Sequence, residues 1–183
     1  MHALVRRPSP RLADGLVTHI ERAPVDVDIA RIEEPGTLDG GDVLKHGGTV
    51  WVGEGGRTNA EGIAQLRALL GPLGGEVVAV PLSKVLHLKS AVTALPDGTV
   101  IGHEPLVDDP AVWGARFLPV PEESGSHVVV LDDDTLLMAS SAPLSRAMFE
   151  ERGYTVVAVD ISEFEKLEGC VTCLSVRLRA AQG

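Results

Sequence analysis

The chain alternates between short apolar runs, which are typical of strands, and segments with helical periodicity. A strand-like run at residues 50–53 is followed by a helical pattern at 60–70 and by a second strand-like run at 76–81. Within the helical segment, Ile63 and Leu70 recur at a spacing that places them on one face of a helix. The pattern therefore predicts a strand, an amphipathic helix and a second strand.

The same order of elements occurs twice more, so the chain contains an internal repeat. Each unit also has an earlier strand, which lies at residues 91–95 in the second unit and at 127–131 in the third. Turns at Pro96-Asp97-Gly98 and Asp132-Asp133-Asp134 join these strands to the next. The later strand, helix and strand lie at 99–103, 107–113 and 117–121 in the second unit and at 135–139, 144–152 and 155–159 in the third. Such units cannot bury their apolar faces alone, so the sequence predicts an α/β fold of ββαβ units packed around a centre.

The composition is that of a globular protein with a single domain spanning residues 1–183. This length is enough for a hydrophobic core, and 44% of the residues are hydrophobic although only 3% are aromatic. A net charge of −10 argues against a surface for nucleic acid or anionic membranes. No apolar run reaches the ~20 residues of a membrane span, and two cysteines cannot form a disulfide framework. These observations predict a cytoplasmic protein.

A cysteine, a histidine and a carboxylate stand in three separate apolar or glycine-rich segments. The segment of the cysteine, residues 172–176, is predicted to be a strand. Cys173, His87 and Asp39 are the residue types of a nucleophile, a general base and an orienting acid. A thiol is a weak nucleophile until a neighbouring group favours the thiolate, and histidine does this most readily near neutral pH. Spacing does not show whether the three residues meet. Each also has a structural interpretation, as a buried thiol, a core histidine and a turn aspartate.

Four short motifs around these residues resemble the dimethylarginine dimethylaminohydrolases, a branch of the guanidine-modifying (pentein) superfamily. They are Leu-Asp-Gly-Gly-Asp-Val-Leu at 38–44, Arg57-Thr58-Asn59, Leu-His-Leu-Lys-Ser at 86–90, and Glu168-Gly169 followed by Thr-Cys-Leu-Ser-Val at 172–176. They occur in the family's order. The motif at 86–90 favours this branch over arginine deiminases and amidinotransferases, which share the Gly-Gly-Asp motif and the terminal cysteine. The segment 1–16 also resembles the family's first strand and the loop after it.

The resemblance implies a propeller-like α/β fold in which five ββαβ units surround the active site. Cys173 would be the nucleophile, His87 the general acid and base, and Asp39 the acceptor that fixes the imidazole tautomer. The implied reaction is hydrolysis of asymmetric dimethylarginine or monomethylarginine to citrulline and an alkylamine through a covalent cysteine intermediate. It needs no metal and no organic cofactor. The implied partner is this small substrate, and a homodimer is one possible assembly.

The resemblance also implies residues that hold the substrate. Arg57 would clamp the α-carboxylate, since a guanidinium fork matches carboxylate geometry. Leu167 and Glu168 lie where the family presents backbone and side-chain acceptors, and Pro8 lies in the loop that lines the entrance. Arg57 and Glu168 have an alternative interpretation as solvated surface residues.

Other polar residues near the motifs are given structural interpretations. Asp42 is expected to bond nearby backbone amides, and Thr58 or Asn59 to cap the helix predicted at 60–70. The histidines other than His87, among them His127, stand in turn or strand-edge settings and are given no function.

The chain departs from the family's pattern between residues 30 and 31. A further unit of the family, which carries a Phe-x-Glu-Asp-like motif and an arginine for the substrate, is expected there. The three phenylalanines are Phe117, Phe149 and Phe164, and none of them precedes Glu-Asp. Either the protein lacks this unit, or a segment between Ala30 and Arg31 is missing from the sequence.

Three other functions remain open. The chain could be a hydrolase of another guanidine such as arginine, as in arginine deiminases, or an inactive binding remnant that lacks the acidic unit. Alternatively, Cys170 and Cys173 form a Cys-Val-Thr-Cys motif, whose spacing also fits redox or metal chemistry. Redox pairs usually open a helix, whereas Cys173 opens the strand-like segment 174–178, and a thiolate metal site would need two further cysteines.

Overall fold

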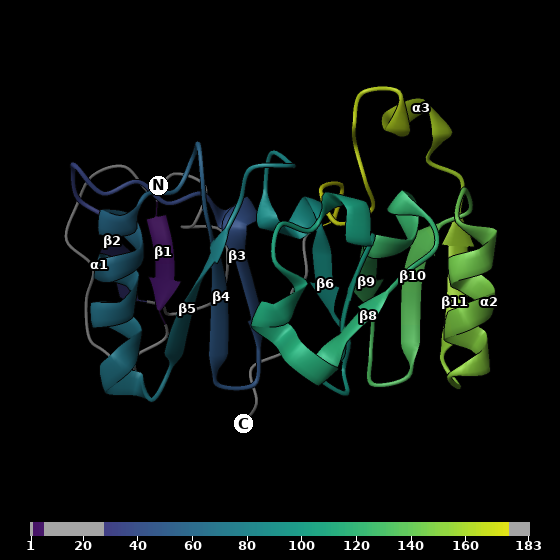
Figure 1. The fold of residues 1–183 in the computed structure, drawn as a ribbon, viewed down its shortest axis with the longest axis horizontal. Coiled ribbons are helices and arrows are strands. Elements are labelled where there is room, and N and C mark those ends of the chain that lie inside the picture. The colour runs from purple at the N-terminus through teal and green to yellow at the C-terminus, as the bar shows by residue number, and fades with distance from the viewer. Residues whose placement is uncertain (1, 6–27, 176–183) are drawn as a thin grey trace.

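The structure is a computed structural model that describes the backbone of residues 2–5 and 28–175, with side chains from residue 30 onward. The predicted repeat forms three small mixed sheets (Figure 1). The first contains β3 (Val43–His46), β4 (Thr49–Glu54) and β5 (Glu76–Pro81), the second β6 (Val92–Ala94), β7 (Val100–Gly102) and β8 (Phe117–Pro119), and the third β9 (Val128–Val130), β10 (Thr135–Ala139) and β11 (Thr155–Val159). In each sheet the middle strand pairs antiparallel with the earlier strand and parallel with the later one.

Helices provide the parallel crossovers of the first and third units, as predicted. Helix α1 (Ala60–Leu70) connects β4 to β5, and α2 (Pro143–Glu151) connects β10 to β11. The side chain of Asn59 caps α1, because its Oδ1 accepts a hydrogen bond of 2.9 Å from the backbone N–H of Gly62. Of the two cap candidates, Asn59 is therefore the correct one.

The middle unit differs from the prediction. A helix was expected at 107–113, but the structure has two 3₁₀ segments, Glu104–Leu106 and Pro110–Arg116. Proline opens each segment near its first residue, and Gly114 interrupts the second with a φ of 53°. Proline removes a backbone donor and left-handed backbone breaks the helical ladder, so the crossover cannot form an α-helix.

The first strand is present where the sequence predicted it. Strand β1 (His2–Val5) pairs antiparallel with β2 (Asp28–Arg31). Ala30 and Arg31 are consecutive positions of β2, so the junction at which a further family unit was expected lies inside a strand. The loop after β1, which contains Pro8, lies outside the described residues.

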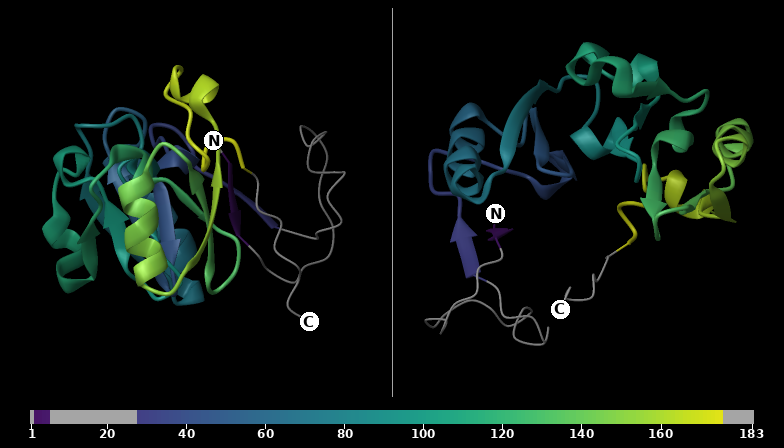
Figure 2. Two further views of the ribbon diagram at one scale, coloured as in Figure 1. Left: turned by 90° about the vertical axis from the view of Figure 1, so that its right-hand side faces the viewer. Right: turned by 90° about the horizontal axis from the view of Figure 1, so that it is seen from below.

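The three sheets follow one another around an arc (Figure 2, right), which confirms the propeller-like α/β arrangement. One buried cluster, which includes Trp51 and Trp113, joins the first sheet to the second. Another, which includes Met138 and Phe149, joins the second to the third, and a third cluster around Ile63 lies beneath α1. Neighbouring units thus bury each other's apolar faces, as expected of repeated units.

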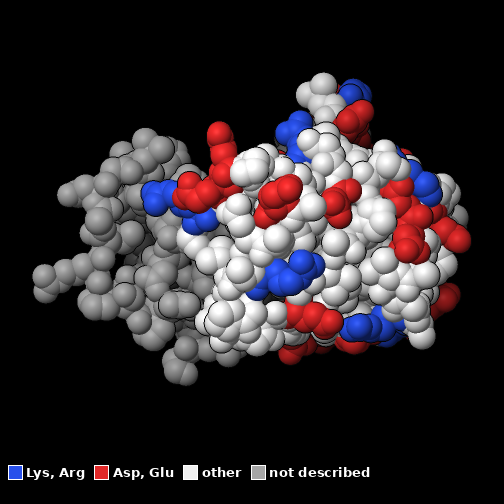
Figure 3. All heavy atoms as spheres, turned by 60° about the vertical axis from the view of Figure 1, so that its left-hand side comes forward, with Lys and Arg blue, Asp and Glu red and all other residues white. Residues whose placement is uncertain are grey.

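The surface is mixed in charge, and the helices are short. On the face shown in Figure 3, acidic and basic side chains are interspersed rather than separated into patches. Among the described helices, none has the length and apolar character that would let it cross a membrane.

Candidate active site

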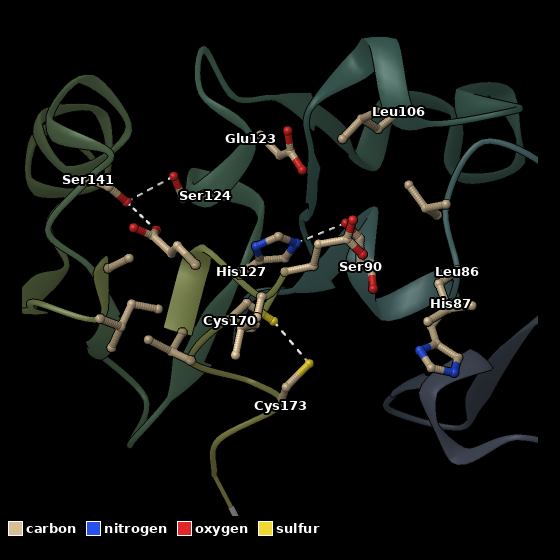
Figure 4. A pocket seen from close by; sticks show the side chains of 18 of the residues that line it. Leu86, His87, Ser90, Leu106, Glu123, Ser124, His127, Ser141, Cys170 and Cys173 are labelled. Atoms are coloured by element: carbon tan, nitrogen blue, oxygen red, sulfur yellow. Dashed lines mark hydrogen bonds between the residues drawn. The ribbon is translucent and has the colours of Figure 1, made fainter. Parts of the chain in front are cut away.

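A cavity of about 700 Å³ is lined by segments that are far apart in the sequence (Figure 4). The loop between β5 and β6 contributes Leu86, His87 and Ser90. The segment before β9 contributes Glu123, Ser124 and His127, and the segment after helix α3 (Ser162–Glu165) contributes residues 167–171 and Cys173. The propeller-like packing therefore brings the predicted histidine and cysteine to one cavity.

His87 is half-buried against the glycine-rich segment that precedes β3. Its Nε2 atom lies 3.5 Å from Oδ1 of Asp39. This nitrogen is buried and makes no hydrogen bond with any described group, so the pair is a contact of two ionisable groups rather than a formed hydrogen bond. Because Asp39 is itself only 29% exposed, its carboxylate is well placed to orient the imidazole.

Asp39 is held by the turn that it begins. Its Oδ1 accepts a hydrogen bond of 2.8 Å from the N–H of Gly41, and the short 3₁₀ turn Gly40–Asp42 follows. Its own N–H donates to the hydroxyl of Thr58 at 2.9 Å. Asp39 therefore both stabilises the turn and directs its carboxylate toward His87.

Asp42 has a structural role, as predicted. Its side chain is fully buried, its Oδ2 accepts a hydrogen bond of 2.6 Å from the Thr58 hydroxyl, and its Oδ1 accepts one of 3.1 Å from the N–H of Leu88. Leu88 is the residue after His87. Asp42 thus links the segment that carries Asp39 to the turn that carries His87.

Cys173 lies in a turn rather than in the strand predicted for residues 172–176. Residues 171–174 turn about the Cys170 carbonyl, which accepts hydrogen bonds of 3.0 and 3.1 Å from the N–H groups of Cys173 and Leu174. Because these N–H groups donate within the turn, they are not available to pair with a neighbouring strand. The strand prediction is therefore wrong for residues 172–175. Val176 lies outside the described residues.

The thiol of Cys173 contacts a second thiol. Its Sγ lies 3.2 Å from Sγ of Cys170, and both cysteines are free. Partial burial raises the pKa of the Cys173 thiol, and the hydrogen bond and charge of Cys170 raise this pKa further. Figure 4 shows Cys173 and His87 on different walls of the cavity. A raised pKa disfavours the thiolate, so this arrangement does not activate the thiol.

Four of the predicted site residues line the cavity, and they are Cys173, His87, Leu167 and Glu168. Leu167 is 84% exposed, and Glu168 has a left-handed φ of 59°, which is uncommon for a residue with a side chain. This backbone turns the chain from α3 back into the cavity wall.

One predicted substrate-binding residue is not brought to this cavity. Arg57 is exposed, is not part of the cavity wall, and forms no hydrogen bond or ion pair within the described part of the chain. Pro8 lies outside the described residues, so its prediction stays untested.

The structure adds residues that the sequence did not point to. Glu123, Glu165, Ser141 and His127 line the cavity, and the Ser141 hydroxyl donates to Glu165 at 2.5 Å. No local motif marks them, because they lie in separate short helices and loops and meet only when the third unit packs beside the second. In the ranges 2–5 and 28–175, no group of three metal-ligating side chains is found.

Comparison with known proteins places this site in a family. No family model matches the chain. An N(G),N(G)-dimethylarginine dimethylaminohydrolase of Streptomyces coelicolor is 50% identical, over 97% of this chain and 96% of the relative. The enzyme of the same name from Pseudomonas aeruginosa is 33% identical, over 96% of this chain and 70% of the relative. The chain belongs to the dimethylarginine dimethylaminohydrolase family.

A solved structure shows the same fold. A cysteine-to-serine mutant of the Pseudomonas aeruginosa enzyme, complexed with citrulline, matches with a TM-score of 0.72 and 33% identity over 81% of this chain. The chain spans 58% of that structure. The alignment with the Streptomyces relative runs over 250 positions, whereas this chain has 183 residues, so the relative contains positions that this chain lacks.

Proposed function

We propose that this chain hydrolyses an N-omega-methylated arginine, asymmetric dimethylarginine or monomethylarginine, to citrulline and an alkylamine. The observation that carries the proposal is the convergence of Cys173 and His87 on one cavity, with Asp39 beside the imidazole. These are the nucleophile, the acid and base, and the orienting carboxylate that a covalent amidine hydrolysis requires. The names of the curated relatives support the same reaction.

Each step of the proposed reaction uses one of these residues. The Cys173 thiolate forms a bond to the guanidinium carbon, and the carbon–nitrogen bond to the alkylamine breaks. His87 in its protonated form gives its proton to the departing amine. Neutral His87 then takes a proton from a water molecule, whose oxygen bonds to the same carbon as the carbon–sulfur bond breaks. The remaining proton on that oxygen passes to solvent, which leaves neutral citrulline, and the thiolate is restored.

The charge of the cavity suits a cationic substrate. Three glutamates line the cavity, and they are Glu123, Glu165 and Glu168. One lysine, Lys84, also lines it, and its Nζ donates to a backbone carbonyl at 2.7 Å. A guanidinium placed beside sulfur would also favour the thiolate, because a nearby positive charge lowers a thiol pKa. Substrate binding would therefore lower the pKa of the Cys173 thiol, whereas the contact with Cys170 raises it.

The proposal is tested by a substitution and a substrate comparison. Cys173→Ser should abolish citrulline formation while circular dichroism shows an unchanged fold. Wild-type protein should form more citrulline from dimethylarginine than from arginine at equal concentration. Turnover that persists in Cys173→Ser would refute the assignment of the nucleophile, and a preference for arginine would favour the arginine deiminase-like alternative.

An inactive binding protein is the second candidate, favoured by the positions of the relative that this chain lacks. An intact mass of 19.3 kDa would show that the chain is complete at residues 30–31. Calorimetry with dimethylarginine should then detect binding without citrulline formation. A substantially heavier protein would show that a segment is missing from the sequence, and would favour the working hydrolase.

Several finer features remain proposals. We propose that Arg57, Leu167, Glu168 and Pro8 hold the amino-acid part of the substrate. Of the three that the structure describes, Leu167 and Glu168 line the cavity and Arg57 does not. Dimerisation, a cytoplasmic location and the lack of nucleic-acid partners stay predictions.

A further inference from the structure

His127 lies in the wall of the cavity but outside the proposed catalytic group. It follows the short 3₁₀ helix Glu123–Ser126 and directly precedes β9, and its side chain is half-buried. Its Nε2 atom lies 2.8 Å from the backbone carbonyl oxygen of Ser90 (Figure 4). A side chain of the third unit thus reaches the loop between the first and second units.

The contact fixes the hydrogen on one ring nitrogen. A carbonyl oxygen only accepts hydrogen bonds, so Nε2 of His127 must carry the hydrogen that it donates. Both the neutral ring with hydrogen on Nε2 and the protonated ring meet this requirement. His127 is therefore the donor of this hydrogen bond, and the Ser90 carbonyl is the acceptor.

Ser90 ends the turn that carries His87. The Ser90 N–H donates to the His87 carbonyl at 2.9 Å, which closes the 3₁₀ turn Leu88–Ser90. Asp42 accepts the N–H of Leu88 at the start of this turn, and His127 donates to its last carbonyl. The turn is therefore held at both ends by side chains that come from the first and third units.

The side chain of His87 has little else to fix it. Its Nε2 forms no hydrogen bond with a described group, and its distance to Asp39 is 3.5 Å. The position of the imidazole thus depends on its backbone and on its packing against Gly41. We propose that His127 is a positioning residue for the hydrolysis, because it holds the turn that places His87 in the cavity. The catalytic part of this inference rests on the proposed function.

Two variants of His127 and one matched control test the proposal. His127→Leu removes the donor and keeps the bulk of the side chain, whereas His127→Gln keeps a donor. His46→Leu is the control, because Nε2 of His46 also lies 3.0 Å from a backbone carbonyl, that of Pro96, but away from this cavity. The readouts are the ring signals of His87 in NMR spectra of histidine-labelled protein, and kcat and KM for dimethylarginine.

We expect His127→Leu to move the His87 ring signals and to lower kcat by roughly 100-fold with little change in KM, since small misplacements of a reacting group have effects of this size. His127→Gln should restore part of kcat, and His46→Leu should resemble wild type. Unchanged His87 signals in folded His127→Leu would overturn the proposal. If this variant does not fold, His127→Ala takes its place in the comparison with His127→Gln.

The NMR readout separates this inference from the proposed function. If wild-type protein releases no citrulline, the proposed function fails, but a shift of the His87 signals in His127→Leu and not in His46→Leu still supports the anchor. If wild-type protein is active and His127→Leu keeps its kcat, the positioning role is wrong while the hydrolase assignment stands.

Discussion

The ring of His87 lies directly over Gly41, and there is no space between them for a side chain. A Cβ atom at position 41 would be 2.5 Å from Cγ and 2.6 Å from Cδ2 of His87. Gly41 does not adopt a positive φ, so a close approach and not a special backbone conformation requires the glycine here. The second glycine of the Gly-Gly-Asp motif therefore sets where the imidazole can lie.

Gly41→Ala should displace His87 and reduce activity. The added methyl must move either the ring or the turn, and we expect kcat for dimethylarginine to fall by roughly 100-fold. Gly71→Ala is the matched control, because no atom lies within 4 Å of its added Cβ and its φ is −54°. Equal kcat values for Gly41→Ala and Gly71→Ala would show that the ring position is not critical.

Thr58→Val should destabilise the protein, because it leaves buried Asp42 without its 2.6 Å hydrogen bond and removes the acceptor of the Asp39 N–H. A buried polar group that loses its partner costs about 1–3 kcal/mol of the free energy of unfolding. Urea unfolding measures this loss as a lower midpoint with an unchanged m value. Thr155→Val, on the exposed face of an edge strand, should change stability by no more than about 0.5 kcal/mol. A similar effect of both substitutions would contradict the role of the buried network.

Glu122→Ala should weaken the start of α2 in a pH-dependent way. Burial raises the pKa of Glu122, but hydrogen bonds from the Ser145 N–H and hydroxyl and from the Leu144 N–H outweigh it, so this pKa lies below its ordinary value. A lowered folded-state pKa gives stability that is present above the unfolded-state value of about 4.3 and is lost as the pH falls through the folded-state value.

The substitution should therefore cost about 1 kcal/mol of unfolding free energy at pH 7, in line with the loss of a helix cap, and progressively less at acid pH. Chemical denaturation across this pH range measures the difference. Glu151→Ala, at the other end of α2, provides the control and should show no such loss. A cost for Glu122→Ala that stays constant down to acid pH would argue against an ionised cap.

The fold was largely predictable because its units repeat and carry their own local signals. The helix at 60–70 combines an Asn59 cap with apolar residues on one face, so its bounds agree with the structure. The helix expected at 107–113 failed because prolines and Gly114 divide that crossover, and an apolar pattern alone does not reveal this. The prediction thus held where local capping and periodicity agreed, and failed where they conflicted.

The site was predictable only in part. Asp39 and His87 stand in distinctive motifs, and their contact follows from how the first two units pack. His127 and Glu165 reach the cavity from the third unit, and only the arrangement of the units in space reveals them. Arg57 stands in a motif but forms no hydrogen bond or ion pair with the residues that the structure describes, since a motif fixes a residue's place in the chain and not the direction of its side chain.

Cys170 and Thr172 should change the pKa of the Cys173 thiol, and therefore its reactivity, in opposite directions. Burial and Cys170 raise the pKa of the Cys173 thiol, whereas the Thr172 hydroxyl lowers it. A raised pKa means less thiolate at a given pH, so alkylation of Cys173 should reach half its maximal rate above about pH 8.5, the ordinary thiol value. Cys170→Ala should move this midpoint down, and Thr172→Val should move it up. Site-resolved mass spectrometry after timed iodoacetamide treatment measures each rate, and midpoints that move in the same direction would contradict the assignment of the two contacts.

The two thiols should also form a disulfide under mild oxidation. Their sulfurs are 3.2 Å apart, and a disulfide needs about 2.05 Å, so a small movement of the turn at residues 171–174 is enough. With hydrogen peroxide as oxidant, the two thiols would lose two hydrogens and form one sulfur–sulfur bond while the peroxide is reduced to two waters. We expect the protein mass to fall by the mass of those two hydrogens, Cys173 to resist alkylation, and a thiol reductant to reverse both changes. Cys170→Ser should instead leave Cys173 open to sulfenic acid formation. Oxidation of wild-type protein to a sulfenic acid without a disulfide would show that the turn is too rigid to close the pair.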